Sequence, residues 1–237
     1  MAEQIVRDAK LWMDGVDLTA DLSSIVLDYG AEVVENSTLG NSTRSRLGGL
    51  KTIGLSSEGY WNSTPDDKFF SSLGVADVPF SIGKTDGSDG TLAYTMKGIQ
   101  GQYSPGGSIG EMFAFSVSAE ATGDLIDGTI MHNAARTASG NGTARQLGAI
   151  SAGQKLYAVM HVIAASGTTP TLDVIVESDD NESFTSGVTR ATFTQKVAIG
   201  SQWIEVDGPI TDDWWRISYT IGGTTPSFTF VNILGIQ

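Results

Sequence analysis

The chain has 237 residues, 14 Lys and Arg against 27 Asp and Glu, and a net charge of −13. It contains no cysteine, which excludes disulfide frameworks, thiolate metal sites and cysteine nucleophiles. Two histidines, His132 and His161, leave little material for a Ser-His-Asp triad or a multi-histidine metal site. Nucleic-acid-binding proteins gather Lys and Arg into clusters, so this acidic chain is expected to repel DNA.

Alternation of apolar and polar residues predicts a series of short strands. Residues 156–165 are apolar on both faces apart from His161, which predicts a central strand. Thr64 is predicted to cap one short helix, with Pro65 at its first position and Gly74 at its end. The remaining predicted strands cover residues 24–29, 55–61, 113–118, 172–176, 191–194, 214–221 and 228–236.

These elements predict an all-β protein, a β-sandwich or barrel with one short flanking helix, followed by a second β-sandwich. The stretch 133–143 is small, polar and without apolar periodicity, and it suggests a boundary between domains 1–135 and 136–237. The first domain carries a net charge of −10 and the second −3. We therefore expect the acidic character of the protein to reside mainly in the first domain.

A short repeat occurs in the second domain, where Gly167-Thr-Thr-Pro170 recurs as Gly223-Thr-Thr-Pro226. Glycine can supply an unusual φ and proline fixes a turn, so both copies are predicted to be hairpin connections. Two interpretations remain open. The copies form one binding rim, or the same hairpin is simply used twice.

No motif predicts a catalytic residue, a metal site or a cofactor. Asp86 and Asp89 have a spacing reminiscent of a calcium loop, but Lys97 occupies the position of the late bidentate glutamate, which favours a hairpin turn. Residues 179–182 form an acidic cluster that is either a solvated loop or a loose calcium site. His161, inside an apolar strand, is interpreted as a core or interface residue rather than a catalytic base.

Tryptophans permit a different function, a carbohydrate-binding module. Asp212-Asp213 precedes Trp214-Trp215, which is either a turn entering a strand or an aromatic platform for a sugar. The candidate platforms are Trp61, Trp203, Trp214 and Trp215.

Residues 34–49 form the most informative segment, a long polar stretch between two predicted strands that shows no pattern of its own. Long loops in compact domains are usually functional or disordered. Arg44 and Arg46 make it basic within an acidic chain, so it is suited to docking on an acidic surface, such as that of a second copy.

Several segments together resemble the major tail tube proteins of long-tailed bacteriophages. The resemblance rests on the strand at 24–29, the segment Asn36-Ser-Thr-Leu-Gly-Asn-Ser-Thr-Arg-Ser-Arg46, Gly48-Gly-Leu-Lys51 and the strand ending in Tyr60-Trp61. The short helix, the strand at 110–116 and the C-terminal residues 215–230 also fit. The match is a pattern that covers most of the chain.

The resemblance implies a non-enzymatic virion structural protein, made in the bacterial cytoplasm and located in the tail. Its partners are copies of itself in stacked hexameric or pseudo-hexameric rings and other tail proteins, with neither a cofactor nor a membrane. The second domain is either an appended sandwich or a duplicated tube fold, which leaves six or three chains per ring open. The inter-ring loop implied by the resemblance contains Asn36, Thr38, Asn41, Thr43, Arg44 and Arg46.

DNA is expected to pass through such rings without tight binding, because a negative wall keeps phosphates from settling. The carboxylates considered for this wall are Glu58, Asp86, Asp89 and Glu111. The alternatives to a tube subunit are a capsid decoration protein, a tail adaptor and, least favoured, the carbohydrate-binding module.

Overall fold

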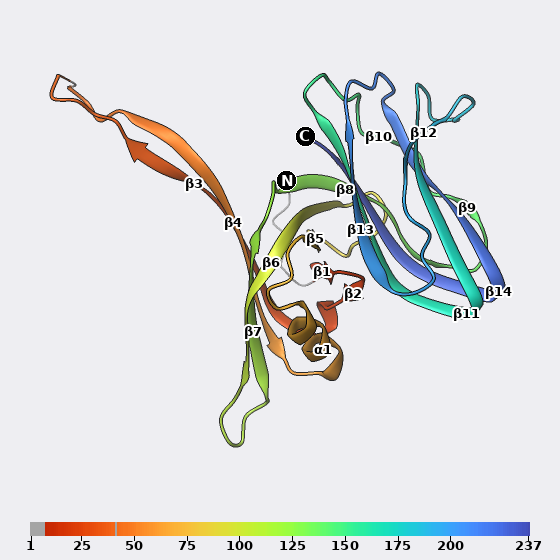
Figure 1. Ribbon diagram of the computed structural model, residues 1–237, viewed down its shortest axis with the longest axis horizontal. Coiled ribbons are helices and arrows are strands. Elements are labelled where there is room, and N and C mark those ends of the chain that lie inside the picture. Colours follow the sequence, from red (N-terminus) through yellow and green to blue (C-terminus); the bar gives the residue numbers. More distant parts are fainter. Residues whose placement is uncertain (1–7, 41) are drawn as a thin grey trace. The chain divides into compact units, whose positions relative to one another are not determined.

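The computed structural model describes residues 8–40 and 42–237 (Figure 1). Antiparallel strands dominate and one short α-helix is present in the described part, which confirms the all-β prediction. The chain divides into two compact units. We call residues 21–77 and 97–124 the arm unit, and residues 8–20, 78–96 and 125–237 the sandwich unit.

Four antiparallel strands build the arm unit, in the order β3 (Leu22–Glu35), β4 (Arg46–Tyr60), β7 (Ala114–Ala121) and β6 (Leu92–Gly106), of which residues 97–106 belong to this unit. β4 pairs with β3 and β7, and β7 pairs with β6. Both outer strands keep a free edge within the described residues. β3 pairs only with β4, and β6 has no strand beside its outer edge after Gln100.

One face of this sheet is covered by α1 (Ser63–Ser72). Phe69 of the helix lies 5.3 Å from Phe115 and 5.5 Å from Tyr103, measured between ring centroids. Gln100, fully buried, donates from its side-chain amide to the carbonyl of Phe69 at 2.9 Å. The helix therefore packs its apolar stripe on the alternate residues of β6 and β7 that point toward it.

The helix begins earlier than the sequence suggested. Asn62, with φ −143° and ψ 154°, takes the N-cap position that was predicted for Thr64, so Pro65 lies in the first turn rather than at its first residue. Gly74 follows the helix with a φ of +75°, as expected for a residue that ends a helix, and its N–H donates to the carbonyl of Gln100.

Two long strands, β11 (Lys155–Asp179) and β14 (Trp214–Ile236), form the sandwich unit's framework and pair with each other along most of their lengths. Both the first and the second half of each long strand contribute residues to one apolar core. Met160 and Val174 are examples from the two halves of β11. The other elements of the unit are β1 (Lys10–Met13), β2 (Val16–Asp17), β5 (Val78–Gly83), β8 (Ile126–Arg136), β9 (Gly140–Asn141), β10 (Arg145–Gln146), β12 (Val188–Thr192) and β13 (Gly200–Asp207), with the 3-10 turn η1 (Thr19–Asp21) at its boundary.

The repeated Gly-Thr-Thr-Pro segments are not hairpin connections, and that prediction is wrong. They lie opposite each other in the middle of β11 and β14, where Thr168 pairs with Thr224 and the register shifts. Gly167 and Gly223 do adopt unusual φ values, +116° and +112°. A Cβ on Gly167 would lie 2.8 Å from the carbonyl oxygen of Thr225, so the close approach of the two copies requires glycine.

The compact units do not follow the predicted division at residues 135 and 136. That position lies inside β8, which pairs with β14 through Ala135 and its neighbours. The stretch 133–143 is also held in place, since Gly140 pairs with Tyr219 and the Asn133 N–H donates to Asp89 at 2.6 Å. The arm unit is instead an insertion, in two segments, between parts of the sandwich unit.

Limited digestion with trypsin distinguishes the two divisions. We expect the first cut after Arg44, whose side chain is 73% exposed and which lies between strands. Arg136 and Arg145 lie in paired strands and their Nε atoms are buried, so both should resist. Mass spectrometry of the early fragments provides the readout. A first cut at Arg136 or Arg145 would instead support separate domains 1–135 and 136–237.

Candidate functional site

The sheet of the arm unit has a second face that no element of this unit covers. Alternation places Leu55 and Ser57 of β4 on the buried helix side and leaves Ser56 and Glu58 exposed on the opposite side. Strand pairing extends this open face into three rows across the sheet: Asp28, Gly54, Glu120 and Ile99; Val26, Ser56, Ser118 and Gln102; and Ser24, Glu58, Ser116 and Ser104.

The open face has a distinct chemistry. Hydroxyl, amide and carboxylate groups dominate it, its apolar members are Val26 and Ile99, and none of the residues in the three rows is lysine or arginine. An antiparallel sheet can present one solvated face, so polar residues here do not destabilise the fold. The face offers hydrogen-bond acceptors and negative charge, and its three rows contain no cationic side chain that could pair with a phosphate group.

Only one of the four carboxylates proposed for a DNA-facing wall belongs to this face. Glu58 lies on it, and the structure adds Asp28 and Glu120, which sequence reasoning missed. Each of them lies an even number of residues from the other open-face residues of its own strand, β3 or β7, and this spacing was the available signal. Asp86 and Asp89 lie in the sandwich unit, between β5 and β6, whereas Glu111 lies at the turn between β6 and β7.

Beyond Gly54, β3 and β4 continue without a third strand and form a two-stranded arm, residues 30–53 (Figure 1). Isolated hairpins of this kind are marginally stable in water. The arm nevertheless exposes large apolar side chains, which is typical of an interaction surface. Their exposed fractions are 65% for Val33, 44% for Val34, 110% for Leu39, 59% for Leu47 and 81% for Leu50.

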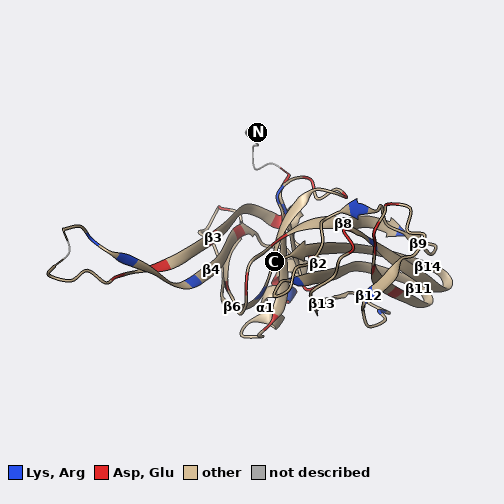
Figure 2. Ribbon diagram, turned by 90° about the horizontal axis from the view of Figure 1, so that it is seen from above, with Lys and Arg blue, Asp and Glu red and all other residues tan. Residues whose placement is uncertain are grey.

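The predicted inter-ring loop forms the tip of this arm. Its ends are strands rather than structureless chain, because Val34 pairs with Leu47 and Glu35 with Arg46, so the loop proper covers residues 36–45. The tip holds Asn36, Thr38, Thr43 and Arg44, Arg46 begins β4, and Asn41 lies outside the described residues. Figure 2 shows basic and acidic residues following one another along the arm.

A second tip lies at the opposite end of the same sheet, where β6 turns into β7. Tyr60 pairs with Ala114 at this end, and the Trp61 N–H donates to the carbonyl of Phe113 at 2.9 Å. The Trp61 and Phe113 rings meet edge to face with centroids 6.2 Å apart. This tip also exposes apolar side chains: Ile109 at 107%, Met112 at 67%, Phe113 at 51% and Trp61 at 45%.

His161 is a satisfied core residue, as predicted. It is fully buried, and its Nδ1 accepts from the Gly15 N–H at 3.3 Å, which leaves Nε2 to donate to Ser81 Oγ at 2.9 Å. Ser81 then donates to Thr95 Oγ1, and Thr95 donates to the carbonyl of Phe80 at 3.0 Å. In this chain of hydrogen bonds the Nε2–H of His161 donates to the serine hydroxyl, whereas activation of a nucleophile requires the imidazole to accept a hydrogen bond from it.

His132 has a different environment. It is fully buried between the rings of Phe230 and Tyr219, with centroids at 4.5 and 5.4 Å, and neither ring nitrogen has a hydrogen-bond partner among the described residues. Burial lowers its pKa to about 4, although the Asp89 carboxylate, 3.8 Å from Nδ1, acts in the opposite direction. His132 is therefore neutral at physiological pH.

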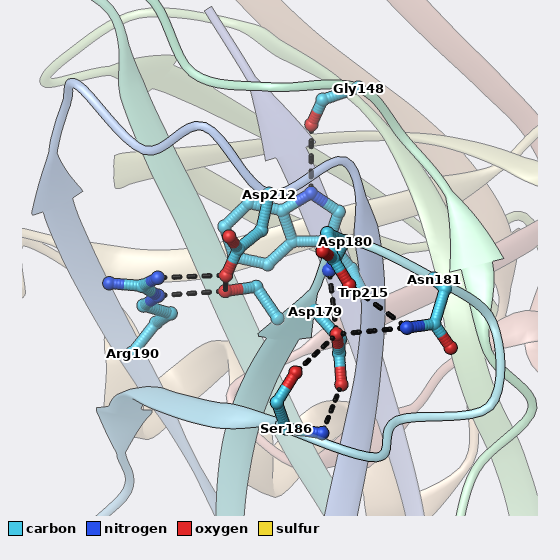
Figure 3. A network of polar contacts seen from close by, with 9 residues as sticks. Gly148, Asp179, Asp180, Asn181, Ser186, Arg190, Asp212 and Trp215 are labelled. Atoms are coloured by element: carbon cyan, nitrogen blue, oxygen red, sulfur yellow. Dashed lines mark hydrogen bonds and ion pairs between the residues drawn. The ribbon is translucent and has the colours of Figure 1, made fainter.

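The acidic cluster at 179–182 is a fixed loop, as Figure 3 shows. Asp179 is buried and accepts from the N–H groups of Asp180 and Ser186 at 2.7 and 2.9 Å and from the Ser186 hydroxyl. Burial would raise the pKa of Asp179, but these donors outweigh it and lower the pKa. Both of its carboxylate oxygens accept hydrogen bonds from these donors, and no cluster of potential metal ligands occurs in the described residues.

Beside it, Asp212 accepts from Ser178 at 2.7 Å and from Arg190 at 2.8 Å, and these contacts lower the pKa of its carboxyl group. Trp215 is fully buried and donates from Nε1 to the carbonyl of Gly148 at 2.8 Å. It cannot serve as a sugar platform, so that part of the carbohydrate hypothesis is wrong. The Asp212-Asp213 pair leads into β14, as the turn interpretation predicted.

Asp86 belongs to the predicted turn. Its carboxylate accepts from the Ser88 N–H at 3.1 Å and from the Ser88 hydroxyl at 2.8 Å, which lowers its pKa.

In the described part of the chain, no helix is long and apolar enough to span a membrane.

Comparisons with known proteins find only low similarity in sequence and in structure. No protein-family model matches the chain, and no curated protein matches its sequence. Among solved structures, a chain from the tail of an empty GTA particle with C6 symmetry has 16% identity over 52% of this chain and 97% of its own, with a TM-score of 0.40. A chain from the virion of a native gene transfer agent particle has 17% identity over 52% and 97%, also with a TM-score of 0.40.

The SPP1 Dit (gp 19.1) protein, described as a paradigm of the hub adsorption apparatus in phages that infect Gram-positive bacteria, has 11% identity over 97% of this chain and 99% of its own. Its TM-score is 0.39. At these scores and identities the likeness assigns no family to the chain.

Proposed function

We propose that the protein is a virion structural subunit, a phage tail tube protein that forms rings with the open face of the arm unit lining a DNA channel. The observation that carries the proposal is this four-stranded sheet, which has one covered face, one acidic and hydroxyl-rich face without Lys or Arg in its three rows, and two free edges. The tail tube resemblance in the sequence supports the same function.

The free edges can join neighbouring copies. β3 and β6 run in opposite directions, because each of the three pairings from β3 through β4 and β7 to β6 is antiparallel. The β6 edge of one copy can therefore continue an antiparallel sheet with the β3 edge of the next. A closed ring of strands removes the unpaired edges that otherwise promote uncontrolled association.

The number of strands favours six copies in a ring. Each copy contributes four strands through its arm unit, and the described residues contain one such unit. A closed cylinder of about eight strands has an interior filled by side chains, whereas one of roughly 16 to 18 strands leaves an aqueous channel. Three copies would supply about 12 strands and six copies about 24, so the hexamer provides an open channel.

The two-stranded arm, residues 30–53, supports stacking of the rings. It extends the sheet along the strand direction and exposes apolar side chains together with Arg44 and Arg46. Partners are therefore other copies in the same ring, copies in the next ring and other proteins of the tail. DNA passes along the open face without tight binding.

A ring-forming tail adaptor is the second candidate. The sandwich unit is the larger of the two units and makes no contribution to the proposed channel sheet beyond the shared strand β6, which leaves it available for other tail proteins. An adaptor would form rings that do not stack into long tubes, so electron microscopy of the purified protein separates the two functions.

Placing lysines on the open face tests the channel. Assembled wild-type protein should not retard duplex DNA even at low salt, where screening is weakest. Ser56→Lys with Ser118→Lys places two cations on paired strands of this face, about twelve per hexameric ring. We expect DNA retention at low salt that is lost as the salt concentration rises to about 0.2 M.

The matched control is Thr189→Lys with Thr220→Lys, which adds the same charge at exposed positions of the sandwich unit. It should retain much less DNA. Equal retention by both variants, or salt-sensitive DNA binding by the wild type, would contradict a channel lined by the open face.

A further inference from the structure

The two exposed apolar tips of the arm unit lie at opposite ends of one sheet. β3 and β4 pair from Leu22 and Gly59 at one end to Glu35 and Arg46 at the other. The turn between β6 and β7 lies beyond the pair of Tyr60 and Ala114, at the end away from the arm. Each copy thus carries one apolar tip at each end of its strands.

We define the tip between β6 and β7, residues 107–113, together with Trp61, as the seat. Its exposed side chains are Ile109, Met112, Phe113 and Trp61. The turn itself is fixed, since the Glu111 N–H donates to the carbonyl of Ser108 at 3.1 Å and Gly110 has a φ of +92°. The seat is therefore a preformed apolar surface rather than a loose loop.

The end of the arm and the seat carry opposite charges. The arm ends in Arg44, 73% exposed, and Arg46, whereas the rest of the arm carries Glu32, Glu35 and Lys51. The seat contains one charged residue, Glu111. Opposite charges around an apolar centre are the usual composition of a specific protein interface.

We propose that the seat of one copy receives the arm of a second copy, so that arm and seat together are the stacking contact of the assembly. This inference rests on the proposed function and identifies the surface that accepts the arm. Exposed Leu47 and Leu50 would cover Met112 and Ile109, and Arg44 would lie near Glu111. The Arg44 side chain already lies 3.8 Å from Glu35, a contact weak enough in water to be exchanged for an intermolecular one.

The geometry makes the contact heterologous, with different surfaces of the two partners in contact. Because each copy offers its arm at one end and its seat at the other, every added ring presents a new free arm and a new free seat. Such a contact does not close on itself and produces an open stack. The direction of all subunits along the stack is then the same.

Cysteine cross-linking tests the contact directly, because the chain contains no cysteine of its own. The variant Leu47→Cys with Met112→Cys carries one thiol on the arm and one on the seat, both at exposed positions. Assembled under mild oxidation, it should give a ladder of covalent multimers on a denaturing gel. Each single variant should remain without a ladder.

The matched control is Leu47→Cys with Val197→Cys, which moves the second thiol to an exposed position in the sandwich unit and should give no ladder. Tubes that form but do not cross-link between arm and seat would overturn the inference and leave the proposed function standing. Dimers from Leu47→Cys alone would show arm-to-arm contact and would also overturn it. Wild-type protein that stays monomeric would overturn the proposed function and this inference together.

Discussion

Protein carrying Arg44→Glu with Arg46→Glu should form rings that no longer stack. Arg44 lies in the loop at the end of the arm and Arg46 begins β4, in the part of the arm unit that has no third strand. An exposed ion pair contributes only about 0–1 kcal/mol. A ring of six copies multiplies that contribution, so a loss of about 1 kcal/mol per arm becomes about 6 kcal/mol per ring, or roughly 10⁴-fold weaker stacking.

Sedimentation and negative-stain images provide the readout, and circular dichroism confirms that the variant is folded. Arg44→Lys with Arg46→Lys is the matched control, because it preserves the charge and should preserve stacking. Tubes of wild-type length from the glutamate variant would show that the arginines make no stacking contact.

Acid should destabilise the sandwich unit through His132. Its folded-state pKa is depressed to about 4 from an ordinary value of 6.5, so the folded state disfavours the proton. The stability is fully present above pH 6.5 and is lost as the pH falls from 6.5 toward 4. A shift of this size corresponds to about 3 kcal/mol in the free energy of unfolding.

The expected loss is measured by urea unfolding of the whole chain at pH 7 and pH 4.5. His132→Phe is the informative control, since phenylalanine keeps an aromatic ring against Phe230 and Tyr219 without a group that titrates. The variant should lose less stability between the two pH values than the wild type. Parallel losses in both proteins would show that other groups dominate the acid response.

Local patterns in the sequence predicted segments of six strands but missed β1, β5, β6, β8 and β13. Alternation located parts of β3, β4, β7 and β14, and the doubly apolar stretch at 156–165 lies in β11, which pairs with both β13 and β14 there. These predictions succeed because each strand buries alternate residues, or both sets when it is central, and this leaves a signal in the strand itself.

Pairing between distant segments was not predictable in the same way. Gly167 and Gly223 indicated an unusual backbone conformation. Only the fold shows that the two Gly-Thr-Thr-Pro segments face each other in adjacent strands. The discontinuous arm unit could not be predicted for a similar reason. Its two segments are joined by strand pairing, and no change in composition marks where they begin and end.

The candidate site was predicted only in part from the sequence. Arg44 and Arg46 marked the arm through their charge in an acidic chain. The open face was missed because Asp28, Glu58 and Glu120 come from three strands, and only the register of β3, β4 and β7 places them on one side.

Electron cryomicroscopy of the assembled wild-type protein shows directly whether the open face of the arm unit lines the channel of a six-membered ring. We expect hollow rings with six-fold symmetry, a continuous sheet joined between β3 and β6 of neighbouring copies, and Ser56, Glu58 and Ser118 facing the channel. Rings in which α1 faces the channel and these three residues face outward, or a protein that remains monomeric, would contradict this expectation.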